Sequence, residues 1–244
     1  MRTSRSEFVE RTRRAAWAYG REFRDGLLAQ FKERYGMVEV PPPALIIAEL
    51  LTDFIGVDLK DDPLALNVYA QAEWSEGMPL VTVNSRINRI KGVKDPEGVK
   101  RVAMWHEGVH VVRDIEAIRL GRPGLLPGFE APPKIVCYRA GPRSVASEVW
   151  AREFWAEEAG RAAAVSLAAL RKAAAFRELL FLAERSDGRV KQGWPLLYQA
   201  AGDIGVNSTA LVKQLRLEGL IVTPKDTSEG IIVQTSLLES REAG

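Results

Sequence analysis

The chain has two histidines, and both lie in one short segment, Trp-His-Glu-Gly-Val-His at residues 105–110. Residues four apart on an α-helix share a face, so His106 and His110 can direct two imidazoles at one metal ion. Glu107 lies beside them and can accept a proton from water next to that ion. The spacing is typical of zinc-dependent hydrolases, although such short patterns also arise by chance in histidines that cap or solvate a helix. The sequence predicts a Zn²⁺ site with Glu107 as the catalytic base.

The segment around the histidines has the pattern of one long helix. Asp95 is placed as the N-cap, Pro96 in the first turn and Glu97 near the positive end of the helix dipole. Apolar residues recur at helical spacing up to the second histidine, and Gly121 followed by Pro123 predicts the end of the helix. Polar side chains on or beside an apolar stripe need partners, and a metal ion is one such partner.

The predicted zinc site lacks a third ligand within the helix itself. A catalytic zinc usually has three protein ligands and leaves one position for water. The chain has no third histidine and only one cysteine, Cys137, so we expect a carboxylate from another element. Asp114 is a candidate to orient the ring of His110, and Tyr138 and Arg139 are candidate oxyanion donors, although surface or core roles are common for such residues. The downstream carboxylate candidates are Glu116, Glu130, Glu148, Glu153, Glu157 and Glu158.

A second motif favours one of these carboxylates. Residues 148–157, Glu-Val-Trp-Ala-Arg-Glu-Phe-Trp-Ala-Glu, resemble the second conserved helix of the ImmA/IrrE family of metallo-endopeptidases, which has the form Glu-x-x-Ala-x-x-Phe followed by small residues and a Glu. The leading Glu of that helix completes the family's zinc site, so the resemblance implies this role for Glu148. Glu153 is the alternative, because the stretch between His110 and Glu148 is longer than is usual in the family.

The resemblance covers about residues 41–159 and has consequences for function. Members often carry a helix-turn-helix after the peptidase part, and some cleave helix-turn-helix repressors. The resemblance therefore implies a regulatory zinc endopeptidase whose protein substrate is such a repressor. One departure is Gly108, because the family's small residue usually stands directly before the second histidine, where this chain has Val109. A peptidase-like fold that only binds a partner is a further alternative.

The coarse pattern predicts an α+β protein in two domains. Residues 1–185 are expected to form a mainly helical, zincin-like peptidase domain with a small sheet, and residues 186–244 a winged-helix-like domain. The strand at 80–84 is predicted either to line the cleft, where an extended substrate could pair its backbone, or to be an ordinary sheet strand. Further helices are expected at 5–35, 44–54 and 142–184, the last with a break near Gly160, and further strands at 57–59 and 66–72.

The C-terminal part supports a second hypothesis. Two short helices around Gly205, followed by two strands, have the outline of a winged helix-turn-helix. Only two residues of its predicted reading helix are basic, and affinity for duplex DNA comes largely from phosphate neutralisation. The alternative function is therefore a DNA-binding or protein-docking regulator with a non-catalytic peptidase-like fold. The candidate DNA-binding residues are Ser208, Thr209, Lys213 and Arg216.

The composition excludes few classes of protein. The formal net charge is +2 over 244 residues, so overall electrostatics favour neither nucleic acid nor a membrane surface. A single cysteine excludes an internal disulfide and suits a reducing compartment. No signal peptide and no apolar run of membrane-spanning length are visible. We therefore expect a soluble cytoplasmic protein.

Overall fold

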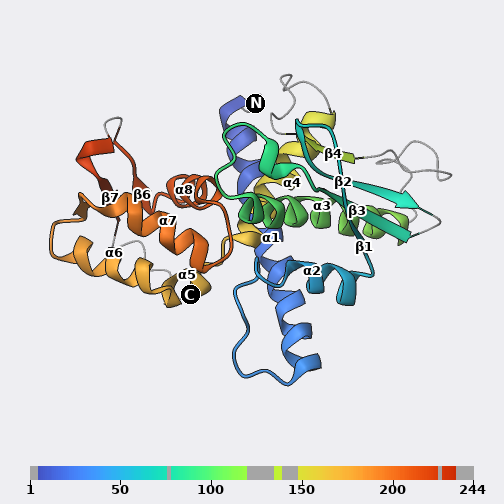
Figure 1. The fold of residues 1–244 in the computed structure, drawn as a ribbon, viewed down its shortest axis with the longest axis horizontal. Coiled ribbons are helices and arrows are strands. Elements are labelled where there is room, and N and C mark those ends of the chain that lie inside the picture. Colours follow the sequence, from blue (N-terminus) through green and yellow to red (C-terminus); the bar gives the residue numbers. More distant parts are fainter. Residues whose placement is uncertain (1–4, 76–77, 120–134, 139–147, 225–226, 235–244) are drawn as a thin grey trace. The chain divides into compact units, whose positions relative to one another are not determined.

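The chain folds into two compact units, Met1–Ala164 and Val165–Gly244, each of which combines helices with a small sheet (Figure 1). The α+β class predicted from the sequence is confirmed. The computed structural model describes residues 5–75, 78–119, 135–138, 148–224 and 227–234.

Three long helices form the body of the first unit. α1 (Arg5–Tyr35) is the predicted first helix and ends at Gly36, whose φ of 62° suits glycine. α3 (Pro96–Arg119) begins as predicted, because Oδ1 of Asp95 accepts a hydrogen bond of 2.9 Å from the backbone N–H of Gly98. α4 (Glu148–Ala164) packs against both α1 and α3. The core between them combines small and aromatic residues: Ala16, Val109, Ala156 and Ala159, with Tyr19, Phe23 and Trp155 against them.

A buried ionic network ties α1 to α4. Glu158 of α4 is 1% exposed and accepts a hydrogen bond of 2.9 Å from Nε1 of Trp17 on α1. Its carboxylate also pairs with Arg161 on the same helix, and lies 3.4 Å from Nε of Arg13 on α1. A buried carboxylate is tolerated when it is paired and hydrogen-bonded in this way. Glu158, one of the carboxylates considered from the sequence as a metal ligand, therefore pairs with side chains of α1 and α4 instead.

The sheet of the first unit has the strand order β1-β3-β2-β4. β3 (Met78–Asn84) pairs in parallel with β1 (Asp58–Asp62) and antiparallel with β2 (Val68–Ser75), which in turn pairs antiparallel with β4 (Ile135–Tyr138). Of the two alternatives for the strand at 80–84, the ordinary sheet strand is confirmed, and the strand that offers its backbone to a substrate is wrong. β3 lies inside the sheet, so both of its backbone edges are already hydrogen-bonded. α3 packs against this sheet through β2 and β3.

The short helix after the proline run is less regular than predicted. α2 (Ile47–Leu50) passes into a π-helical turn, Leu51–Ile55, which ends at Gly56 with φ 77°. Leu51 of this turn packs closely against Gly108, since a Cβ on that residue would lie 2.7 Å from Cδ2 of Leu51. The predicted buried face of this segment is confirmed, with Ile46, Ile47, Leu50 and Leu51 all buried. A 3₁₀ turn, Ile87–Arg89, follows β3.

The second unit contains four helices and a three-stranded sheet among its described residues. α5 (Leu167–Lys172) and α6 (Ala174–Glu184) come first, followed by β5 (Arg189–Val190), α7 (Gly193–Asp203) and α8 (Ser208–Leu217). β6 (Ile221–Val222), a 3₁₀ turn (Thr227–Glu229) and β7 (Ile231–Val233) complete it, with strand order β5-β7-β6. The sequence predicted the division after residue 185, which lies beyond α6. The compact unit begins earlier because α6 packs against α7, β5 and β7.

Local signals for the C-terminal helices are confirmed. Asn207 caps α8, its Oδ1 accepting a hydrogen bond of 2.8 Å from the N–H of Ala210. Gly205 and Gly219 both have positive φ, 79° and 74°, at the predicted turns. β5 was not predicted. Within the part of the chain that the structure describes, no helix combines the length and apolar character needed to cross a bilayer.

Candidate metal centre

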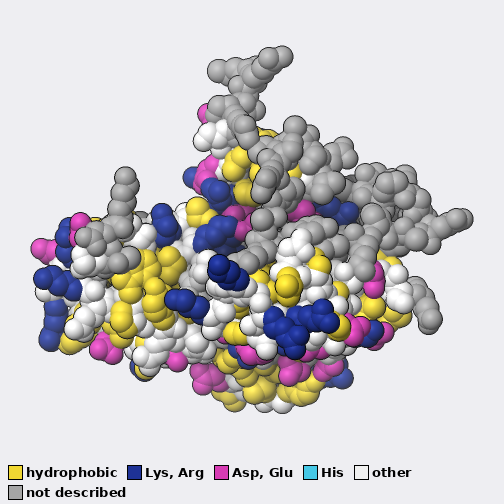
Figure 2. All heavy atoms as spheres, turned by 45° about the horizontal axis from the view of Figure 1, so that its top comes forward, with side chains coloured by type: hydrophobic (Ala, Val, Ile, Leu, Met, Phe, Trp, Pro, Cys, Tyr) yellow, Lys and Arg dark blue, Asp and Glu magenta, His cyan; other side chains and the backbone are white. Residues whose placement is uncertain are grey.

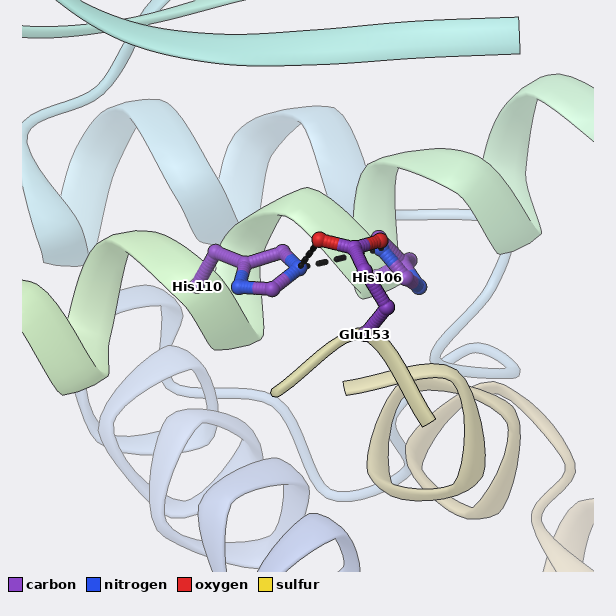
Figure 3. A group of neighbouring side chains, drawn as sticks. All are labelled: His106, His110 and Glu153. Carbon is purple, nitrogen blue, oxygen red and sulfur yellow. Dashed lines mark hydrogen bonds and ion pairs between the residues drawn. The ribbon is translucent and has the colours of Figure 1, made fainter. Parts of the chain in front are cut away.

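Two helices of the first unit bring three ligand groups together. α3 carries His106 and His110, and α4 presents Glu153 to both rings (Figure 3). The Nε2 atoms of the two histidines lie 3.1 Å apart, and the carboxylate oxygens of Glu153 lie 3.3 Å from Nε2 of His106 and 3.4 Å from Nε2 of His110. All three ligand atoms lie within 4.8 Å of one another, so this group could hold a metal ion.

The spacing and chemistry of the three groups fit zinc. Ligand atoms about 2.0–2.1 Å from a tetrahedral zinc ion lie roughly 3.3–3.4 Å from each other. The separations of 3.1, 3.3 and 3.4 Å are close to this value. Two imidazole nitrogens and one carboxylate also form a donor set of known catalytic zinc sites, which leave the fourth position for water.

Burial separates these histidines from surface residues. His106 is 7% exposed, His110 is 1% exposed, and Glu107, the predicted base, is 0% exposed. The side chain of Glu153 keeps 16% of its surface. Histidines that merely cap or solvate a helix would lie in water, and these do not. Their polar atoms instead face one another, which is the arrangement that a bound cation would stabilise.

The charges of the metal-free site follow from this packing. Burial alone would raise the pKa of Glu153, but hydrogen bonds from both histidines lower it to about 2. Burial lowers the pKa of His110 to about 4, and the nearby charge of His106 acts in the same direction. Burial would also lower the pKa of His106, but the hydrogen bond to Glu153 and the negative charge of Glu107 outweigh it, so this pKa is raised above 6.5. At any pH below this raised pKa, the proton of the metal-free site is therefore held by His106.

This proton would make metal binding at the site depend on pH. Metal ligation needs a neutral imidazole, so binding must displace the proton of His106 at any pH below its raised pKa. Between about pH 5 and that pKa, we expect the affinity to rise with pH by close to tenfold per unit, with one proton released per zinc. Calorimetric titration in buffers of different ionisation enthalpy measures the proton count. A pH-independent affinity across this range would contradict the charge assignment.

Gly160 sets how closely the two helices approach. The sequence predicted a helix break near this residue, and that prediction is wrong. α4 continues through Gly160 to Ala164, and the helical segment is interrupted only at Val165 and Ser166. A Cβ on Gly160 would lie 2.8 Å from both Cα and N of His106. Gly160 and Glu153 are seven residues apart and so share one face of α4. The glycine therefore lets this face reach α3 and brings the carboxylate of Glu153 to the imidazoles.

Gly160→Ala is expected to destabilise the fold and weaken metal binding. The new methyl group would meet rigid backbone, and overpacking of this kind typically costs about 1–3 kcal/mol. Gly26→Ala in α1 is the matched control, since a Cβ there meets nothing within 4 Å and alanine favours a helix over glycine by up to about 1 kcal/mol. Denaturant unfolding and zinc titration of both variants test this. Equal stability of the two would show that the contact at Gly160 is not tight.

The other predicted site residues have different outcomes. Glu148 is the first residue of α4, but its side chain lies outside the described residues, so its role as a ligand stays a prediction. Position 148 precedes Glu153 by five residues, which is a rotation of about 140° around the helix. The side chains of Asp114, Glu116, Glu130, Tyr138 and Arg139 also lie outside the described residues.

Two features near His110 affect its ring: the environment of its second nitrogen and the charge of Arg152. Its second ring nitrogen, Nδ1, is buried, and no described residue hydrogen-bonds to it. Metal-bound histidines usually donate from this nitrogen to an orienting group, so a partner such as Asp114 remains a prediction. Arg152 was not singled out from the sequence, yet its positive charge contributes to the lowered pKa of His110. Arg152 lies four residues after Glu148, so the helical spacing could have drawn attention to it as a cation near a predicted ligand.

The candidate DNA-binding residues gather in the second unit. Ser208, Thr209, Lys213 and Arg216 all line one groove, together with residues of α7.

No protein-family model, no curated protein and no solved structure matches this chain. The ImmA/IrrE resemblance therefore stays a prediction, and the metal centre is supported by the geometry of His106, His110 and Glu153 themselves.

Proposed function

We propose that the unit Met1–Ala164 is a zinc-dependent endopeptidase domain with a zincin-like fold. The convergence of His106, His110 and Glu153 beside the buried Glu107 carries this proposal. Zinc bound by these three ligands would polarise a water molecule and lower its pKa toward about 7.

Glu107 performs the proton transfers in this proposal. Its carboxylate accepts the proton of the attacking water and donates it to the nitrogen of the leaving amine. Two observations support this role. Glu107 is completely buried, and its negative charge acts on the neighbouring His106. Low surrounding polarity strengthens such charge interactions.

The substrate follows from the family resemblance alone. Members that cleave helix-turn-helix repressors suggest a regulatory endopeptidase acting on a repressor protein, and nothing else in the chain names a substrate. The second unit supports a regulatory role. Its order α6-β5-α7-α8-β6-β7 and its sheet order β5-β7-β6 are consistent with a winged helix-turn-helix.

Elemental analysis tests the metal. Protein purified without chelators is expected to contain one zinc per chain, and His106→Ala is expected to contain almost none. Chelation should stop cleavage of a quenched-fluorescence peptide library, and zinc should restore it. Wild-type protein that neither retains zinc on purification nor takes it up on addition would contradict the proposal.

The second candidate function is a DNA-binding regulator. It is favoured by the four predicted contact residues, which share one surface. If Lys213 and Arg216 neutralise two phosphates, the logarithm of the affinity should fall with the logarithm of the salt concentration with a slope of roughly 2. Binding of a duplex at low salt, lost in Lys213→Glu with Arg216→Glu, would support this function, and no binding at low salt would remove it.

A further inference from the structure

α7 and α8 of the second unit border a groove of about 610 Å³. This size lies within the range of roughly 300–1,000 Å³ that is common for binding pockets. The α7 wall is aromatic, with the rings of Trp194 and Tyr198 6.1 Å apart. α8 contributes Val212 and Leu217 together with hydroxyls and cations. Figure 2 shows one face of this unit, on which hydrophobic side chains gather beside Lys and Arg.

The groove is formed by faces of α7 and α8 that the unit's own core does not use. The core-facing side of α7 carries Leu197, Ala200 and Ala201, and that of α8 carries Ala210, Leu211 and Leu215, all buried. The groove residues lie on the outer sides, where Tyr198 is 55% exposed. A large exposed aromatic beside further apolar side chains indicates a binding surface.

We propose that this groove binds an acidic amphipathic helix of another protein. Helices bind grooves of this type by inserting apolar residues spaced three or four positions apart. The aromatic and aliphatic residues of the groove provide the apolar surface for these anchors. Lys213 and Arg216 are both exposed and lie three residues apart on α8. They are placed to face acidic residues on either side of the apolar anchors of the partner helix. Among the described residues that line the groove, none is acidic, so its charged side chains are all positive and complement an acidic partner.

A protein helix suits the groove better than duplex DNA. Interfaces with DNA are much more positively charged than interfaces between proteins, and their affinity comes largely from phosphate neutralisation. This groove offers two cations around an apolar, aromatic centre. Tyr and Trp are enriched among the residues that dominate protein–protein binding energies. The inference does not depend on the metal centre, because it concerns only the second unit.

The test uses the full chain with Glu107→Gln, so that a bound peptide is not cut. The probe is a synthetic 16-residue helical peptide with Leu at positions spaced by three and four and Glu on both flanks. A scrambled peptide of the same composition and a 16-base-pair duplex are the comparisons. Trp194 is the one tryptophan of residues 165–244, so its fluorescence reports the groove, and Trp194→Phe identifies its signal.

We expect saturable binding of the helical peptide and little binding of the scrambled one. Lys213→Glu with Arg216→Glu should weaken binding by at least about tenfold, because like charges would then face each other. Arg177→Glu with Lys191→Glu is the matched control, since both residues are exposed in the same unit and do not line the groove. Equal binding of the scrambled peptide, an unchanged affinity after the groove reversal, or preferential binding of the duplex would overturn the proposal.

Discussion

Replacing Glu107 by glutamine is expected to reduce peptide cleavage by roughly 10²–10⁴-fold, the usual contribution of a general base. The amide has the shape of the carboxylate but cannot take the proton of the attacking water. Zinc should remain bound, because Glu107 is not a member of the ligand group. Loss of its negative charge also removes one cause of the raised pKa of His106, so the competing proton is held less tightly. Elemental analysis and single-turnover cleavage on the same preparation measure both effects.

Glu157→Gln is the matched control for this experiment. The negative charge of Glu157 also acts on His106, but its side chain is 48% exposed and lies 3.4 Å from Arg161. Its replacement removes a nearby charge without removing the predicted base, so cleavage should change by only a few-fold. If Glu107→Gln cleaves at the wild-type rate with full zinc, Glu107 is not the base. Equal loss in both variants would indicate that the site responds to charge in general.

Local signals predicted several starts and ends of helices in this chain. The Asp95 cap and Pro96 defined the start of α3, the glycines at 36 and 56 defined two ends, and Asn207 defined the start of α8. Each of these depends on hydrogen bonds or backbone angles within a few residues. The two histidines of α3 could likewise be placed on one face of the helix from their spacing alone.

Long-range packing explains what the sequence could not predict. Strand order is set by pairing between distant segments, and the position of β3 between β1 and β2 is not encoded in its own alternation. A glycine within a helical pattern, such as Gly160, usually indicates a helix break. Here Gly160 instead packs against the backbone of His106, fifty-four positions earlier in the chain. The face of α4 that meets α3 is determined by this contact. A motif match along the sequence therefore could not decide between Glu148 and Glu153.

Glu153→Ala is expected to lower zinc affinity by more than the roughly 10–100-fold that loss of a group outside the ligand shell costs. It removes the carboxylate that lies 3.3 and 3.4 Å from the two histidine nitrogens, leaving two imidazoles as ligands. Glu148→Ala is the decisive comparison, because the family resemblance predicts that this residue is the ligand. Competition with a chromogenic chelator measures both affinities, and circular dichroism verifies that each variant is folded.

The zinc affinities of these two variants show whether Glu153, as the geometry indicates, or Glu148, as the family resemblance implies, is the ligand. If α4 faces α3 as the contact at Gly160 requires, Glu148→Ala should bind zinc as the wild type does, since position 148 is turned by about 140° from Glu153 around the helix. The reverse result, with zinc lost in Glu148→Ala and kept in Glu153→Ala, would mean that α4 rotates or extends when the metal binds. In that case the hydrogen bonds of Glu153 to His106 and His110 would belong to the metal-free protein only. Loss of zinc in neither variant would contradict a carboxylate ligand on α4 altogether.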